Sequence, residues 1–319
     1  MLASGNHWRP SVRRLAGSVS AATLAAIALA MLTPGCDDGS TGAAYRPEYA
    51  PLPGRHAAAY VFAIHPLHNP EQLFEAYLPL IRYLESKIPD AQFTLEASRN
   101  YEEFEKKLAA RQFHFALPNP YETLHAIEHG YRVFGKVGED HDFRGIILVR
   151  KDSKIRTLAD LKGKAVAFPA PTAVAATLLP QYYLQTNGLD VTRDIRALYV
   201  GSQESAIMSV LLGTAAAGAT WPQPWERFKA LSPEQAAALE VRWETPPLVT
   251  NSLVVRDDVD KTLLSRVEGV LFTLHQNKEG RRILAGVPVS RIYPANASAY
   301  APVREFLASF NRVVHQLEN

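Results

Sequence analysis

One short segment has the spacing of a metal-binding catalytic motif. His125, Glu128 and His129 form an H-x-x-E-H pattern, and histidines four residues apart lie on the same face of a helix. Such a pair can hold one zinc ion while the glutamate acts as a general base, as in zinc proteases. Because the pattern is short and no third ligand is evident, a zinc metalloprotease is a remote alternative.

The sequence carries no other motif that predicts catalysis. It has no G-x-x-x-x-G-K-[ST] phosphate loop, no G-x-S-x-G nucleophile elbow and no paired-carboxylate constellation. Cys36 is the only cysteine, which excludes an intrachain disulfide and thiol-based metal capture. We therefore expect neither an enzyme nor a bound metal or cofactor.

Polar side chains that can contact an anion follow several predicted strands. His65 directly follows the first strand. Asn119 and Tyr121 lie in a proline-flanked loop after the third strand. Ser202 and Gln203 open a helix after a later strand, where Ser202 can equally be a helix cap. Imidazole, amide and hydroxyl groups can all donate hydrogen bonds to an oxyanion.

Strand and helix patterns alternate from residue 57 onward. Short apolar runs predict strands at 57–64, 92–96, 113–117, 143–150, 164–168, 195–200, 215–220 and 253–256. Amphipathic or capped segments predict helices at 73–84, 101–110, 121–129, 157–161, 172–183, 204–212, 261–275 and 300–316. This alternation predicts an α/β fold with mostly parallel sheets, and it favours two such sheets.

The first 36 residues resemble an export signal. Three arginines precede an uncharged apolar run at 21–32, which is too short to span a membrane. Cys36 follows directly and resembles the lipidated cysteine of bacterial lipoproteins, although Thr33 stands where leucine is usual. We predict a lipoprotein signal peptide at 1–35, lipidation of Cys36 and a flexible Gly/Ser/Thr/Ala/Pro-rich tether at 36–55.

Composition narrows the classes of partner. The 319 residues are 47% apolar and 21% charged, as in ordinary globular proteins. The formal net charge is only +2, so the basic excess of a nucleic-acid-binding protein is absent.

Several motifs in a fixed order resemble a known family. They are LPNPYE at 117–122, RGIILVRKD at 144–152, DSKIRTLADLKGKAVAF at 152–168, LLP at 178–180, GS at 201–202, GAT at 218–220 and WETPP at 243–247. Their order and spacing over about residues 57–310 resemble the phosphate/phosphite/phosphonate branch of ABC-transporter substrate-binding proteins, which have the type-II periplasmic binding protein fold. The resemblance implies two α/β lobes with the ligand in the cleft between them.

The resemblance also implies domain boundaries. Two crossovers between the lobes are expected near 149–153 and 243–249. Lobe one would then comprise 56–150 and 248–319, and lobe two 151–247. Two such lobes close around a ligand by a hinge motion.

In this family the anion binds at a helix N-terminus, which here would begin near Thr172. A hydroxyl cluster of phosphonate binders is replaced by Ala-Val-Ala at 173–175, so backbone amides would bind the anion. The residues expected at the ligand are His65, Tyr101, Asn119, Tyr121, Thr172, Ala173, Val174, Ala175, Ser202, Gln203, Thr220, Trp221 and Asn251.

Two acidic positions that hold an aminoalkyl tail in some relatives are absent here. Asn251 occupies one, and the stretch 221–225, expected to be a loop, contains no acid. The ligand is therefore not expected to be 2-aminoethylphosphonate, unless Glu204 turns inward, because a buried ammonium group needs a carboxylate partner.

The resemblance implies a lipid-anchored monomer on the periplasmic side of the bacterial cell membrane. It would capture a small anion and deliver it to an ABC transporter permease, with no nucleic-acid partner. Alternatively, a protein with the same binding fold could bind its ligand and signal to a membrane sensor kinase. The sequence does not distinguish between a transporter and a kinase as the partner.

Overall fold

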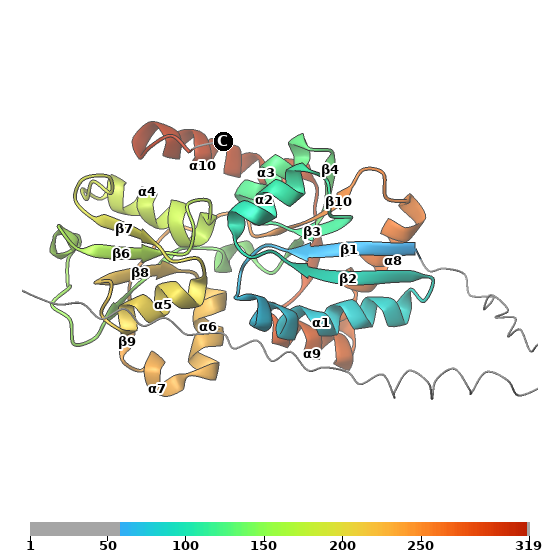
Figure 1. Cartoon of the computed structure of the whole chain (residues 1–319), viewed down its shortest axis with the longest axis horizontal. Helices are drawn as coiled ribbons and strands as arrows, with labels where there is room; N and C mark the ends of the chain where they lie inside the picture. Colours follow the sequence, from blue (N-terminus) through green and yellow to red (C-terminus); the bar gives the residue numbers. More distant parts are fainter. Residues whose placement is uncertain (1–57, 318–319) are drawn as a thin grey trace, which may run out of the picture. The chain divides into compact units, whose positions relative to one another are not determined.

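The computed structural model describes residues 58–317, within which the strands form two sheets. Figure 1 shows helices on both faces of each sheet. The expected two-lobed α/β architecture is confirmed. The predicted signal peptide, Cys36 and the tether lie outside the described residues.

Lobe one is built on a six-stranded sheet with the order β11-β4-β10-β3-β1-β2. Its strands are β1 (Ala58–Ile64), β2 (Ala91–Ala97), β3 (Phe115–Leu117), β4 (Tyr131–Val137), β10 (Ser252–Arg256) and β11 (Ile292–Pro294). Its helices are α1 (Pro70–Lys87), α2 (Tyr101–Ala109), α3 (Pro120–Glu128), α8 (Lys261–Phe272) and α9 (Lys278–Gly286). Successive side chains of β1 point to opposite faces, so Phe62 and Ile64 join one buried cluster and Ala63 joins the other.

Lobe two is built on a five-stranded sheet with the order β7-β6-β8-β5-β9. Its strands are β5 (Ile146–Arg150), β6 (Ala165–Phe168), β7 (Arg196–Tyr199), β8 (Ala217–Thr220) and β9 (Leu239–Glu244). Its helices are α4 (Leu179–Thr186), α5 (Gln203–Leu211), α6 (Pro222–Leu231) and α7 (Pro233–Ala236). α5 packs so closely on β8 that a Cβ at Gly218 would lie 2.6 Å from the Ala206 carbonyl oxygen.

Both sheets are mixed, whereas the sequence predicted mostly parallel ones. β1 is parallel to β2 and β3, and β6 is parallel to β7 and β8. β10 and β5 are antiparallel to both of their neighbours. Each of these two strands enters its sheet directly after the chain crosses between the lobes. They therefore start at the cleft, while the strands that precede helices end there.

The first crossover lies earlier in the chain than the sequence predicted. β5 was expected in lobe one, but it hydrogen-bonds to β8 and β9 of lobe two. The chain therefore leaves lobe one before Ile146, and the predicted boundary at 150 is wrong. The second crossover lies between the end of β9 at Glu244 and the start of β10 at Ser252.

The two crossovers are hydrogen-bonded to each other. The Gly145 amide donates to Thr245 Oγ1 at 2.9 Å, and the Leu248 amide donates to the Phe143 carbonyl at 2.9 Å. We call the paired segments 143–145 and 245–248 the hinge ribbon. Within residues 58–317 the strands of one sheet are connected to those of the other only through this ribbon, so it defines where the lobes can rotate.

The last helix, α10 (Ala301–Val313), contacts both lobes, although the sequence assigned it to lobe one alone. Val303 packs in a cluster of lobe one. The Phe306 ring lies 5.5 Å from the ring of Tyr182 in α4, in an edge-to-face contact. Phe310 is fully buried in a cluster that contains residues of both lobes.

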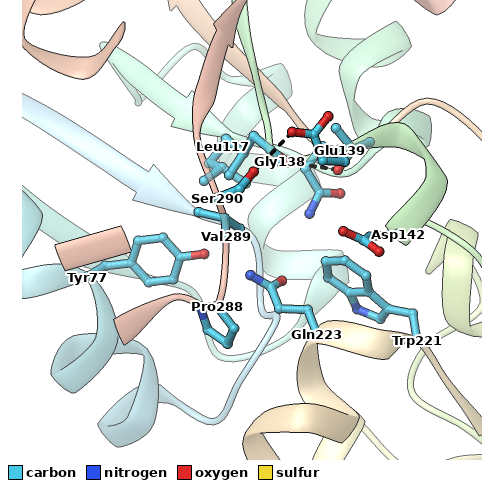
Figure 2. A pocket seen from close by; sticks show the side chains of 13 residues that line it. Tyr77, Leu117, Gly138, Glu139, Asp142, Trp221, Gln223, Pro288, Val289 and Ser290 are labelled. Atoms are coloured by element: carbon cyan, nitrogen blue, oxygen red, sulfur yellow. Dashed lines mark hydrogen bonds between the residues drawn. The ribbon is translucent and has the colours of Figure 1, made fainter. Parts of the chain in front are cut away.

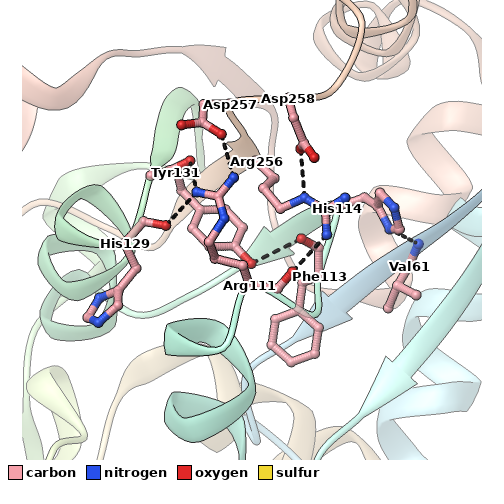
Figure 3. A network of polar contacts seen from close by, with 10 residues as sticks. Val61, Arg111, Phe113, His114, His129, Tyr131, Arg256, Asp257 and Asp258 are labelled. Atoms are coloured by element: carbon pink, nitrogen blue, oxygen red, sulfur yellow. Dashed lines mark hydrogen bonds and ion pairs between the residues drawn. The ribbon is translucent and has the colours of Figure 1, made fainter.

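A polar network fixes lobe one at the end where β10 finishes (Figure 3). Arg111, whose backbone is left-handed with φ of 57°, donates to the His129 carbonyl at 2.8 Å and pairs with Asp257 at 2.5 Å. Arg256 donates to the Arg111 carbonyl at 2.7 Å. Gly130 has a φ of 78°, a backbone conformation that L side chains rarely adopt, so this position needs glycine. The charged side chains of this network are thus paired with one another.

Candidate functional site

A small pocket lies between the two lobes. It is lined by His65, Tyr101, Asn119, Phe143, Ala173, Val174, Ala175, Ala176, Gln203, Trp221 and Asn251. Nine of these were expected from the sequence, while Phe143 and Ala176 were missed. No lysine or arginine is among them, so an anion here would depend on neutral donors.

Backbone amides supply those donors at a helix N-terminus in lobe two. The chain leaves β6, turns at Ala173 and enters a π-helical turn (Val174–Leu178) that continues into α4. The amides of Thr177 and Leu178 donate to the Ala173 carbonyl at 2.8 and 3.2 Å. The preceding amides of the first turn have no acceptor within the helix, and the helix dipole makes this end attractive to negative charge. Short side chains at 173–176 leave these amides accessible from the pocket.

His65 brings a neutral imidazole to the opposite wall. It follows β1 directly, and only 3% of its surface is exposed. Its Nδ1 lies 2.8 Å from the Leu117 carbonyl, so Nδ1 carries a hydrogen that it donates. Burial lowers the pKa of His65 to about 4, opposed by this hydrogen bond and assisted by His68. At neutral pH the imidazole is therefore uncharged, and its second nitrogen, Nε2, is an acceptor.

Tyr101 begins α2 and is a hydroxyl donor in the pocket. It is 4% exposed, and burial raises its pKa well above the usual tyrosine value, with the neighbouring carboxylate of Glu122 adding to the rise. The hydroxyl therefore stays protonated and can donate. Gln203 is fixed nearby, since its Oε1 accepts a hydrogen bond from Thr220 at 2.9 Å.

Asn251 and Trp221 complete the wall next to the hinge. Asn251 is 3% exposed, and its side-chain oxygen has no hydrogen-bond partner among the described residues. The Trp221 ring contacts Phe143 edge-to-face at 5.3 Å. Trp221 is the N-cap of α6, with Pro222 at the first helical position, so the stretch 221–225 is a helix start and not the expected loop.

Four expected residues do not line the pocket. Ser202 is the N-cap of α5, where its hydroxyl accepts the Ser205 amide at 3.1 Å. Thr220 is buried behind the pocket and uses its hydroxyl on Gln203. The Tyr121 ring packs against the His125 ring at a tilt of 36°, with centroids 4.5 Å apart.

The fourth, Thr172, joins the lobes. Its hydroxyl donates to Glu105 of α2 at 2.6 Å, and its carbonyl accepts the side-chain amide of Asn119 at 3.3 Å. Asn119 also caps α3, because its oxygen accepts the amides of Tyr121 and Glu122. The side-chain groups of Asn119 are thus occupied within the protein, although it lines the pocket.

A second interlobe bond lies beside the pocket. His68 Nδ1, on the loop after β1, lies 2.7 Å from Glu204 Oε1 at the start of α5. Glu204 therefore faces His68 and is not among the residues that line the pocket. Together with Thr172, this contact holds the lobes together across the cleft.

A second pocket adjoins the first and shares Trp221 and Asn251 with it. Figure 2 shows the Tyr77 hydroxyl, the Gln223 amide and the Asp142 carboxylate directed toward its interior. The remaining lining residues include Glu139, whose carboxylate accepts hydrogen bonds from Ser290 and Tyr293. Nothing in the sequence pattern pointed to this pocket, because its residues come from α1, the segment after β4, α6 and the segment before β11.

The H-x-x-E-H motif does not form a metal site in the structure. His129 Nδ1 donates to the His125 carbonyl at 2.8 Å, and the His129 carbonyl accepts from Arg111. Between residues 58 and 317, no group of three or more His, Cys, Asp or Glu side chains is placed to hold a metal ion. The same part of the chain contains no helix long and apolar enough to cross a bilayer.

Two solved structures of ligand-binding proteins have a similar architecture. A binding protein component of an ABC phosphonate transporter from Pseudomonas aeruginosa superposes with a TM-score of 0.75 at 19% identity, covering 81% of this chain and 88% of that one. A Prochlorococcus marinus protein, PhnD1, in complex with methylphosphonate, gives 0.73 at 20% identity, covering 81% and 100%. At these identities the likeness shows a shared fold.

Sequence comparison adds the family. A relative named "Probable ABC transporter phosphite binding protein PhnD1", from Prochlorococcus marinus, is 23% identical over 187 residues. That match covers 54% of this chain and 63% of the relative's length. The sequence profile described as "ABC transporter, phosphonate, periplasmic substrate-binding protein" matches residues 62–300, which is most of the chain. The chain therefore belongs to the family of periplasmic substrate-binding proteins of phosphonate ABC transporters.

Proposed function

We propose that this protein captures a small phosphonate- or phosphite-like oxyanion outside the cytoplasm and delivers it to an ABC transporter permease. The observation that carries the proposal is the helix N-terminus at 173–176, whose free amides line a closed interlobe pocket without lysine or arginine. Backbone amides at a helix N-terminus bind oxyanions through directed hydrogen bonds and the helix dipole. The protein acts by binding and release, not by catalysis.

The relatives support this ligand class. One is named as a phosphite-binding protein and one was solved with methylphosphonate. The oxyanion would bind between the amides of lobe two and the Tyr101 hydroxyl of lobe one, so ligand binding and lobe closure are coupled. A small substituent on the anion would extend toward the adjoining pocket beside Trp221.

Attachment to the membrane belongs to the same proposal. The signal-like segment 1–35 followed by Cys36 supports a lipid-anchored protein on the periplasmic side, acting as a monomer. Mass spectrometry of the mature N-terminus tests this. We expect a chain that begins at lipidated Cys36, and an unmodified Cys36 or a retained signal peptide would contradict it.

Val174→Pro tests the anion site directly. Val174 is the first residue of the helical turn and Ala173 before it is extended, so proline fits the backbone and removes only one amide donor. A hydrogen bond to a charged group contributes about 1.5–3 kcal/mol, which corresponds to about 10- to 100-fold weaker binding of methylphosphonate or phosphite in calorimetry. Val174→Thr keeps the amide and is the matched control. Equal affinity of both variants and the wild type would refute an anion bound by this turn.

A further inference from the structure

A groove separate from the anion pocket lies between the lobe-one helices α1 and α9. The two helices pack side by side, and α6 of lobe two approaches them (Figure 1). The cavity between them measures about 640 Å³, within the range of about 300–1,000 Å³ that is typical of ligand sites. Its floor is apolar, because Ala76, Tyr83 and Ile283 line the groove and are buried. The groove therefore has both the room and the apolar surface that a bound segment needs.

Two arginines on facing helices line this groove without a partner. Arg82 of α1 and Arg282 of α9 are both exposed. Neither makes a hydrogen bond or an ion pair with any residue between 58 and 317. A guanidinium group matches the geometry of a carboxylate and binds it through two parallel hydrogen bonds. Each of these two arginines can therefore bind a carboxylate from another molecule.

Arg227 of α6 forms one end of the groove and comes from the other lobe. Its side chain is 16% exposed, donates to the Gly286 carbonyl at 3.4 Å and lies 3.9 Å from the Glu75 carboxylate. Gln223, one turn earlier in α6, donates to the Val287 carbonyl. These contacts join lobe two to lobe one. This end of the groove is therefore complete only when the lobes are closed.

The length and charge of the groove favour an acidic peptide. Arg227 lies beside Glu75, and two turns of α1, about 10 Å, separate Glu75 from Arg82. An extended chain advances about 3.3 Å per residue, so two acidic residues about three positions apart would reach both arginines. The groove contains three arginines and two glutamates, of which Glu279 lies in the first turn of α9, where negative charge stabilises the helix. The excess of positive charge complements an acidic segment.

We infer that the groove formed by Arg82, Arg282 and Arg227 binds an acidic peptide segment of the membrane partner in the closed state of the protein. This inference rests on the proposed function and specifies the chemistry of the partner. A segment that contacts Arg227 of lobe two and Arg82 of lobe one holds the lobes together. By linkage, the oxyanion must strengthen binding of the segment by the same factor as the segment strengthens binding of the oxyanion.

Calorimetry with an acetylated and amidated hexaglutamate peptide tests the inference at low ionic strength, since salt screens ion pairs. We expect hexaglutamate to bind and hexaglutamine not to bind. Saturating methylphosphonate should tighten the binding of hexaglutamate about fivefold or more. Absence of hexaglutamate binding, or equal binding with and without methylphosphonate, would overturn the inference while the proposed function stands. If neither methylphosphonate nor phosphite binds in the absence of the peptide, the proposed function and the inference both fail.

Three variants locate the binding to the groove. The double variant Arg82→Gln/Arg282→Gln removes two pairs with carboxylates, so hexaglutamate affinity should fall about fivefold while methylphosphonate affinity stays the same. Arg304→Gln/Lys154→Gln removes the same charge from exposed residues outside the groove and is the matched control. Arg227→Met should abolish the effect of methylphosphonate on peptide binding. An equal loss in the control, or a full effect of methylphosphonate in Arg227→Met, would overturn the inference.

Two further probes distinguish other occupants of the groove. Tripolyphosphate represents a small polyanion, and vesicles of phosphatidylglycerol represent a lipid surface. We expect both to bind more weakly than hexaglutamate and to be insensitive to the double variant. Tighter binding of either probe that is lost in Arg82→Gln/Arg282→Gln would overturn the assignment to a peptide.

Discussion

The hydrogen bond between His68 and Glu204 should determine how firmly the lobes stay closed. The two side chains belong to different lobes and meet at 2.7 Å, with 2% and 20% of their side-chain surface exposed. Glu204→Ala removes the contact and replaces a residue that does not itself line the anion pocket. If the lobes separate on opening, the His68–Glu204 contact forms only in the closed state. Removing it should therefore shift the equilibrium from the closed state toward the open state.

The size of the effect follows from burial. A hydrogen bond to a charged group contributes about 1.5–3 kcal/mol when buried, and the partial exposure of Glu204 reduces this to about 1–2 kcal/mol. Since a ligand that needs the closed state binds in proportion to its population, apparent affinity should fall about 5- to 30-fold. The loss should appear mainly as faster dissociation, because contacts made after encounter affect the off-rate most.

Calorimetry and stopped-flow dissociation of methylphosphonate measure this, and small-angle scattering of the unliganded protein should show a larger radius of gyration. Lys107→Met is the matched control, since it breaks an ion pair of 2.6 Å to Glu96 that lies wholly within lobe one. It should change affinity less than twofold. Unchanged affinity and radius in Glu204→Ala, or an equal loss in the control, would refute the role of the pair in closure.

Three further outcomes are expected from single positions. Gly145→Ala should destabilise the protein by about 1–3 kcal/mol and weaken ligand binding, because its Cβ would lie 2.7 Å from the Ala175 carbonyl oxygen in the helical turn that begins at Val174. Gly269 faces open space, so Gly269→Ala is the control and should not lower the melting temperature in the same experiment. Glu122 is buried, and burial raises its pKa well above 4.5. The folded state therefore loses stability as the pH rises above the pKa that Glu122 has in the unfolded chain. Glu122→Gln removes this ionisation, so it should raise the melting temperature more at pH 8 than at pH 5. The effect of His65 on stability has the opposite pH dependence, because burial lowers its pKa from 6.5 to about 4. As the pH falls across that interval, the free energy of unfolding should decrease by up to about 3 kcal/mol. Chemical denaturation of His65→Asn should show a smaller decrease over the same pH range.

The elements that the sequence predicted are those with strong local signals. β1 and α1 have an uninterrupted apolar run and a capped amphipathic face, with Asn69 accepting the Gln72 amide before Pro70. β4 was missed, because its apolar pattern is interrupted by Gly135 and by the charged side chains Arg132 and Lys136. The stretch 221–225 was expected to be a loop, but it begins α6, where Pro222 occupies the first turn, the part of a helix in which proline is favoured.

The sequence predicted those pocket residues that directly follow buried strands, because the order of strands along the chain places them at the cleft. His65 and Ala173 follow buried strands, and the carboxyl ends of such strands meet at the cleft. Thr172 and Tyr121 lie in the right loops, but which way a side chain turns depends on partners from other elements, such as Glu105 of α2. The partner sheet of β5 was equally hidden, since the apolar run IILVR suits a buried strand in either lobe.

The position of α10 has a mechanical consequence. Two crossovers side by side form a hinge with one axis, and a rigid rotation about that axis needs no other connection between the lobes. α10 adds a contact away from the crossovers, where Phe306 touches Tyr182 and Phe310 is buried between the lobes. Opening must either slide these rings past each other or stop when the contact tightens. We therefore expect α10 to limit the angle through which the lobes open. A tag or truncation after residue 300 would change that angle, even though it lies outside the binding pocket.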